Sequence, residues 1–261
     1  TPCIEPAAPE FHAHLRGDAV ILKYFELFDG AGAEIAGLED SIYTLENILA
    51  NPDAFLDVDF LFSTWGMPTL TEQQITQHLP HLQCVFYAAG SVQAFARPFL
   101  ACGVHVFSAW AANAVPVAEY TLAEIILATK GFYQRLHRQA DGAAWPNRSV
   151  GVDFPGNYEI TVGIIGAGMI GKMVIERLHT LDKIDILVFD PFLPDEKAAE
   201  LCVTKCDLKT LFAESDVISN HLANNAQTVG MLNGELFDTM KPHCPAEDRF
   251  VNKQFHTAVS I

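Results

Sequence analysis

The segment 159–190 constrains the fold more than any other part of the chain. It begins with a short apolar run, residues 160–165, whose β-branched side chains are typical of a strand buried on both faces. The turn G-A-G-M-I-G at 166–171 follows, and behind it apolar residues recur at helical spacing. A second apolar run, 184–189, ends at Asp190, 19 residues after the last glycine. The segment therefore predicts a complete strand–helix–strand unit.

The glycine turn of this unit has the spacing of a dinucleotide site. Gly166 allows a tight strand-to-helix turn, and Gly168 lets the backbone approach a pyrophosphate without an intervening Cβ. Gly171 lets the helix lie close on the strand. The amides that open the helix, at Met169 and Ile170, would bind the phosphates. We therefore predict that these five residues bind a dinucleotide.

Asp190 predicts which dinucleotide is bound. Its carboxylate would accept hydrogen bonds from the adenosine ribose hydroxyls and repel a 2′-phosphate, which favours NAD over NADP. A bare G-x-G-x-x-G is weak evidence, whereas one between two strand patterns with a terminal acid is specific. The alternative is a structural turn without a ligand, which requires three glycines and an acid to occupy these positions by chance.

Composition limits the protein class and its partners. The 261 residues, half of them hydrophobic and 18% charged, can form a globular protein with two modest domains. The net charge of −16 disfavours nucleic acid and anionic membranes as partners. Without an 18-residue apolar run or a signal pattern, we expect a soluble, cytoplasmic protein. The six cysteines have no C-x-x-C and no zinc spacing, so we predict no metal site.

Strand and helix patterns alternate along the rest of the chain, which predicts a parallel sheet covered on both faces. Residues 115–137 form a long amphipathic pattern, with Pro116 expected in its first helical turn. The remaining expected strands cover residues 57–64, 84–87, 104–107 and 215–221, and the remaining expected helices cover 17–28, 44–50, a segment opening at 71, a segment ending at 101, 207–212 and 233–240.

With these pieces in order, the chain resembles the D-isomer-specific 2-hydroxyacid dehydrogenases over roughly residues 55–242. The resemblance implies an α/β fold, with a Rossmann-type doubly wound parallel sheet and a smaller flavodoxin-like substrate domain, both incomplete. We expect the partial substrate domain at 1–108, the truncated NAD-binding domain at 109–242 and an unrelated or irregular tail at 243–261. The resemblance to this family rests on the turn 88–91, the helix segment 117–119, the fingerprint 162–171, and the segments 188–191, 214–221 and 240–242.

The resemblance implies an NAD-dependent oxidoreductase that transfers a hydride between NAD(H) and a small 2-hydroxy or 2-oxo acid. It places the substrate carboxylate on the turn formed by Ala89, Gly90 and Ser91, for which a plain strand-end turn is the alternative. It places His221 and Thr228 beside the cofactor, with no acid–base role for His221. Asn113 matches a family asparagine near the pocket, with an exposed loop residue as the alternative. Family members commonly dimerise through the nucleotide domain, so the helix at 115–137 is a candidate surface for a homodimer.

The family pattern is not followed after Pro242. The family's arginine, glutamate or aspartate, and histidine follow this point, where this chain has a polar segment without a strand pattern or an Arg-Gly pair. Arg249 and His256 match those positions poorly, so we assign no catalytic residue and expect this chain to be inactive. The alternatives to an enzyme are a non-catalytic NAD-binding protein and a truncated fragment.

Overall fold

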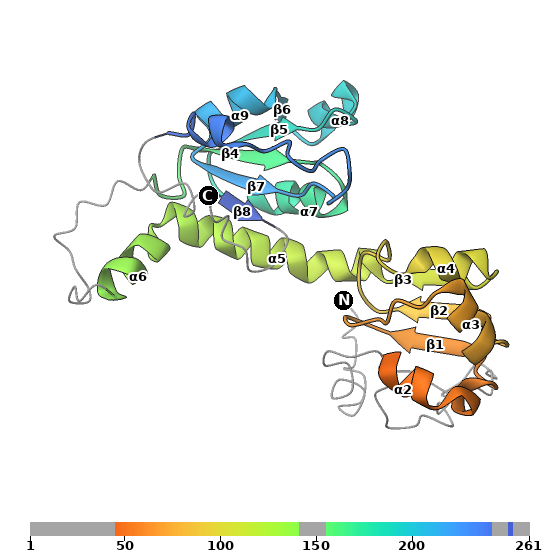
Figure 1. Ribbon diagram of the computed structural model, residues 1–261. Coiled ribbons are helices and arrows are strands. Elements are labelled where there is room, and N and C mark those ends of the chain that lie inside the picture. Colours follow the sequence, from red (N-terminus) through yellow and green to blue (C-terminus); the bar gives the residue numbers. More distant parts are fainter. Residues whose placement is uncertain (1–44, 141–154, 242–249, 253–261) are drawn as a thin grey trace, which may run out of the picture. The chain divides into compact units, whose positions relative to one another are not determined.

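The computed structural model describes residues 45–140, 155–241 and 250–252 (Figure 1). The chain divides into two compact units, Thr1–Asn113 and Ala114–Ile261. The helix expected at 17–28 and the tail residues Pro242, Arg249 and His256 lie outside the described residues.

The first unit is built on a three-stranded parallel sheet in the order β1-β2-β3. Leu61 on β1 and Val85 on β2 point to one face and are fully buried, in a core that includes Phe99 of helix α4. On the other face the rings of neighbouring strands stack, with centroids of Phe62 and Phe86 4.9 Å apart. The elements are α2 (Leu45–Ala50), η1 (Pro52–Phe55), β1 (Phe60–Ser63), α3 (Glu72–His78), β2 (Cys84–Tyr87), α4 (Ala96–Ala101) and β3 (His105–Ser108).

The second unit contains a five-stranded parallel sheet in the order β6-β5-β4-β7-β8. Counted from β4, this is the order 3-2-1-4-5 of a Rossmann sheet. The α/β class and the Rossmann-type sheet predicted from the sequence are confirmed. The elements are α5 (Trp110–Thr129), α6 (Phe132–Ala140), β4 (Ile160–Ile165), α7 (Met169–Leu178), β5 (Ile184–Phe189), α8 (Asp195–Glu200), β6 (Thr204–Lys205), α9 (Leu208–Glu214), β7 (Val217–Asn220), α10 (Gly234–Phe237) and β8 (Phe250–Asn252).

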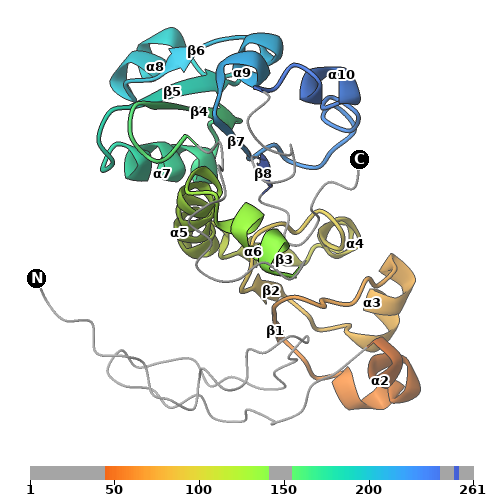
Figure 2. The same ribbon diagram turned by 90° about the vertical axis from the view of Figure 1, so that its left-hand side faces the viewer.

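Helices cover both faces of this sheet (Figure 2). Ile164 of β4 packs in a core with residues of α5 and α7, whereas the next residue, Ile165, packs in a second core with Leu211 and Phe212 of α9. Strand β4 is therefore buried on both sides, as its continuous apolar run predicted.

Two expectations about helix and strand boundaries are wrong. Helix α5 begins at Trp110 rather than Val115, so Pro116 lies inside the helix, and the helix ends at Thr129 before Gly131, which has a φ of 66°. The alanine-rich lead-in at 111–114 favours helix strongly enough to extend it upstream of the proline. We also expected no strand after residue 242, yet β8 pairs in parallel with β7, so the described β7 is not an edge strand.

Candidate functional site

The glycine turn lies at the carboxyl end of β4, where the strand order reverses between β4 and β7. Ligands of doubly wound sheets bind outside the carboxyl ends of the strands at such a point. Gly168 is the N-cap of α7, and a Cβ built on it would have no atom within 4 Å. The amides of Met169 and Ile170 lie in the first turn of α7, where no preceding helical carbonyl is available to them. This geometry leaves room and hydrogen-bond donors for an anionic group.

The other two glycines of the fingerprint are enclosed by backbone. Gly166 has a φ of 89°, and a Cβ on it would lie 3.3 Å from the backbone of His221. A Cβ on Gly171 would lie only 2.1 Å from the carbonyl oxygen of Gly166. The turn can therefore close this tightly only with glycine at both positions.

Asp190 follows β5 and is bonded to two backbone segments. One carboxylate oxygen accepts the N–H of Ala167 in the glycine turn at 2.8 Å, and the other accepts the N–H of Phe192 at 2.8 Å. Asp190 thus lies directly beside the glycine turn, at the sheet edge where the sequence predicted a ribose-binding acid. The sequence pattern did not reveal the bond to Ala167, because it depends on the tertiary approach of β5 to β4.

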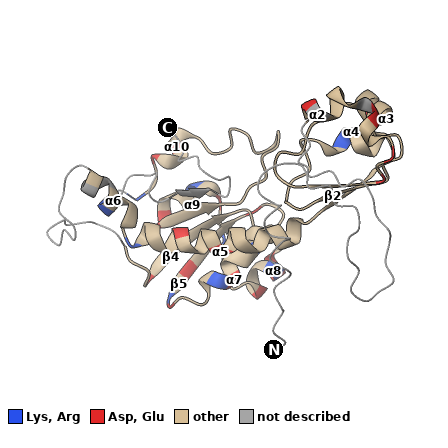
Figure 3. Cartoon of the chain, turned by 90° about the horizontal axis from the view of Figure 1, so that it is seen from below, with Lys and Arg blue, Asp and Glu red and all other residues tan. Residues whose placement is uncertain are grey.

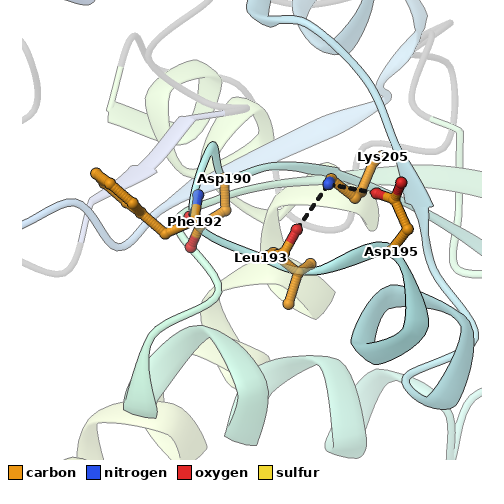
Figure 4. Close-up of polar contacts among 5 residues, drawn as sticks. All are labelled: Asp190, Phe192, Leu193, Asp195 and Lys205. Carbon is orange, nitrogen blue, oxygen red and sulfur yellow. Dashed lines mark hydrogen bonds and ion pairs between the residues drawn. The ribbon is translucent and has the colours of Figure 1, made fainter.

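Lys205 of β6 stabilises the turn after Asp190 by polar contacts (Figure 4). The Lys205 ammonium donates to the carbonyl oxygen of Leu193 and pairs with the carboxylate of Asp195, both at 2.6 Å. The lysine hydrogen bond holds the pKa of the Asp195 carboxyl below its ordinary value. Phe192 is 85% exposed beside Asp190 and presents an aromatic ring to solvent at this edge.

His221 and Thr228 follow β7, and each is held by hydrogen bonds. His221 is 6% exposed, its Nε2 lies 2.9 Å from the Ser219 hydroxyl, and its backbone N–H donates to the carbonyl of Ile165 at 2.7 Å. Thr228 donates its hydroxyl to the carbonyl of Ala223 and accepts the N–H of Asn225. The structure thus brings His221 against Gly166, whereas the Thr228 hydroxyl closes its own loop.

The expected substrate turn follows β2 in the first unit. The Ser108 hydroxyl, at the end of β3, donates to the carbonyl oxygens of Ala89 and Gly90, at 2.9 and 2.5 Å. Because trans peptides point their N–H opposite to the preceding carbonyl, the amides of Gly90 and Ser91 face away from Ser108. A Cβ on Gly90 would lie 3.2 Å from Nδ2 of Asn113, so the structure brings Asn113 to this turn. The positioning role of Ser108 was missed, since a serine at a strand end gives no distinctive pattern.

Residues 45–113, the described part of the first unit, offer little positive charge to an anion. Arg97 on α4 is the one lysine or arginine within residues 45–113 (Figure 3). Among the described residues of this unit, backbone amides are therefore the main donors for a carboxylate at the Ala89–Ser91 turn. In the parts of the chain that the structure describes, no group of His, Cys, Asp and Glu is arranged to hold a metal ion.

Comparisons with known proteins place this site in a family. The model of the "D-isomer specific 2-hydroxyacid dehydrogenase, NAD binding domain" matches residues 122–252, half of the chain. D-3-phosphoglycerate dehydrogenase of Archaeoglobus fulgidus is 30% identical over 139 residues, which cover 53% of this chain and 26% of the relative. (S)-sulfolactate dehydrogenase of Chromohalobacter salexigens is 32% identical over 141 residues, which cover 53% and 44%.

The fold extends the likeness to both units. The apo-structure of D-lactate dehydrogenase from Escherichia coli superposes with a TM-score of 0.60 at 24% identity, over 82% of this chain and 64% of that one. The chain thus spans less than half the length of these two curated relatives and under two thirds of the solved enzyme. Since the matched segment contains the glycine turn, Asp190 and the 3-2-1-4-5 sheet, the chain belongs to the D-isomer-specific 2-hydroxyacid dehydrogenase family, through that family's NAD-binding domain.

Proposed function

We propose that NAD(H) binds across the carboxyl edge of β4, β5 and β7. The amides of Gly168, Met169 and Ile170 bind the pyrophosphate, and the Asp190 carboxylate binds the adenosine ribose diol. The observation that carries this proposal is the bond between Asp190 and Ala167, which sets the acid beside the open phosphate turn. His221 supports the turn from β7, and Thr228 shapes the loop on the same side.

We further propose that the protein acts on a small 2-hydroxy or 2-oxo acid as an NAD-dependent oxidoreductase. NAD supplies the hydride acceptor when bound, and the chain supplies orientation. The amides of Gly90 and Ser91, turned outward by Ser108, bind the substrate carboxylate. Backbone donors suit a carboxylate here because the described part of the first unit carries a single cation, Arg97.

The cofactor proposal is tested by titrating the 261-residue chain with NADH and following nucleotide fluorescence. Saturable binding that Gly168→Val removes supports the site. Binding that persists unchanged in folded Gly168→Val protein would mean that the glycine turn is only structural.

The substrate proposal is tested with oxamate, a 2-oxo acid mimic, titrated into the NADH complex. Ser108→Ala should weaken oxamate binding by about ten-fold, because the turn loses the one hydroxyl donor that its two carbonyls share, and should leave NADH binding unchanged. Ser91→Gly is the control, since it removes a side chain and keeps the amides. Equal oxamate affinity in Ser108→Ala and wild type would contradict the assignment of this turn.

We also propose a cytoplasmic homodimer. Helix α5 has the length and apolar composition of a membrane span, but Ala118 and Ile125 on it are buried with β4 and α7 in the core of the second unit. Its exposed Val115 and Tyr120 offer apolar surface for a second subunit. Sedimentation of the wild type beside a Tyr120→Glu variant tests this, and an unchanged dimer in the variant would exclude the α5 surface.

A further inference from the structure

We propose that Asp190 also positions the pyrophosphate-binding turn, so that one carboxylate couples recognition of the ribose to recognition of the phosphates. This inference rests on the proposed NAD(H) site and adds a second role to an acid whose expected role is ribose binding. In this role Asp190 is a positioning residue, acting on the phosphates through Ala167 rather than by contact.

The geometry gives the carboxylate two backbone partners in different segments. The 2.8 Å bond to the Ala167 N–H fixes the middle of the glycine turn, and the 2.8 Å bond to the Phe192 N–H fixes the exit of β5. The Gly166 N–H donates to the carbonyl of Phe189 at 2.9 Å, which ties the same two segments one residue earlier. The end of β5 therefore binds two successive amides of the glycine turn, those of Gly166 and Ala167.

Because Ala167 is buried, its N–H hydrogen bond to Asp190 is important for the position of the turn. Ala167 is 4% exposed, so water is poorly placed to replace a carboxylate that is removed. A buried amide left without an acceptor is costly, and the turn would shift to find one. The next residue, Gly168, begins the open segment whose amides face the phosphates, so a shift at Ala167 moves those donors directly.

The two bonds leave the carboxylate able to bind ribose. Each carboxylate oxygen has two lone-pair directions, and each spends one on a backbone N–H. The remaining lone pairs stay available to the ribose hydroxyls, and the side chain is already fixed before the ligand arrives. Binding then loses little side-chain entropy at Asp190.

The two roles separate when the probe contains no ribose. Inorganic pyrophosphate can test the turn alone, whereas NADH tests both roles. Asp190→Ala removes the ribose contact and the Ala167 bond together. Asp190→Glu keeps the negative charge, but its extra methylene moves the carboxylate from the position where it accepts both N–H groups. Asp185→Asn is the matched control, because Asp185 is an exposed acid on the same strand.

The experiment measures amide exchange at Ala167 in the 261-residue chain, and affinity for pyrophosphate and NADH, in the wild type and the three variants. We expect Ala167 to exchange about ten-fold faster or more in Asp190→Ala and Asp190→Glu, as loss of a charge-assisted hydrogen bond implies. Pyrophosphate affinity should fall in both variants, and Asp185→Asn should match wild type in every measurement. Global stability from urea unfolding identifies any variant that is simply unfolded.

Unchanged Ala167 exchange and unchanged pyrophosphate affinity in folded Asp190→Ala, with NADH affinity reduced, would overturn the inference and leave Asp190 as a ribose ligand alone. Wild-type protein that binds neither NADH nor pyrophosphate would refute the proposed function instead. In that case the exchange rate at Ala167 still decides whether Asp190 holds the turn.

Discussion

The three glycines of the turn 166–171 have three different environments, and each environment determines the effect of a substitution. Gly166 has positive φ, Gly168 faces open space and Gly171 lies against the carbonyl of Gly166. The same residue type thus serves backbone conformation, ligand access and helix–strand packing at successive positions.

Replacing these glycines should separate ligand binding from stability. Gly168→Val should abolish NADH binding and leave stability nearly unchanged, because its backbone is in the extended region and no atom lies near a Cβ. Gly171→Ala should lower the free energy of unfolding by about 1–3 kcal/mol or more, because its Cβ meets fixed backbone at 2.1 Å. Urea unfolding and NADH titration of both variants test this, and a Gly168→Val protein less stable than Gly171→Ala would contradict it.

The cysteines should differ in reactivity. Burial, with smaller contributions from Asp207 and Glu214, raises the pKa of the Cys206 thiol to about 11, whereas Cys202 is exposed. At pH 8 the Cys206 thiol is protonated, and the thiolate is the reactive form. Iodoacetamide should therefore modify Cys202 well before Cys206, as read by peptide mass spectrometry, and the difference should vanish in denaturant. Faster labelling of Cys206 in the native protein would be inconsistent with this environment.

At the scale of elements, β4 is held by an aspartate near each end. Asp190 binds the Ala167 N–H beyond its carboxyl end, and Asp216 accepts the Thr161 N–H at 2.8 Å near its amino end. Asp216 also accepts from the Lys241 ammonium at 2.8 Å, in a pair whose side chains are 13% and 30% exposed. Lys241 is thus part of the structural support of the sheet.

Removing this lysine should cost stability. Lys241→Met should lower the free energy of unfolding by about 1–3 kcal/mol, because a largely buried carboxylate loses its cation. The control is Lys197→Met, whose pair with Glu200 is exposed and should matter by no more than about 0.5 kcal/mol. Urea midpoints compare the two, and equal losses would show that burial of Asp216 does not govern the effect.

The elements that could be predicted from the sequence are those whose signal is local. The ranges 84–87, 160–165 and 184–189 match β2, β4 and β5 at both ends, because each is an apolar run bounded by turn residues. Thr71 opens α3 with a capping box to Gln74. The start of α5 and the strand β8 were missed, because helix propensity overrode a proline signal and because β8 depends on pairing with β7 rather than on its three residues.

The features of the candidate site could likewise be predicted only where their signal is local in the sequence. Glycine spacing and the acid at 190 are sequence features, so the turn between β4 and α7 could be predicted from the sequence, and its binding of a dinucleotide stays a prediction. The bonds of Asp190 to Ala167, of Ser108 to Ala89 and of Lys205 to Leu193 join segments up to 23 residues apart and follow only from the packed sheets.

Binding of NADH and its oxidation with a 2-oxo acid are two different properties of the chain. We predict that the 261-residue chain binds NADH but does not oxidise it with pyruvate, glyoxylate or hydroxypyruvate, since Arg249 and His256 match the family's catalytic positions poorly. Acid–base catalysis alone typically contributes about 10²–10⁴-fold. The measurement is NADH absorbance over time, beside an active family dehydrogenase as the positive control. Comparable rates in both would return Arg249 and His256 to consideration.

Parallel fluorescence titration with NADH and NADPH tests directly whether the turn after β4 and the acid after β5 form an NAD site. We expect NADH to bind more tightly than NADPH by about ten-fold or more, since the ribose diol gains hydrogen bonds to the Asp190 carboxylate, whereas a 2′-phosphate is repelled by its like charge. Equal affinities for the two nucleotides, or no binding of either, would contradict it.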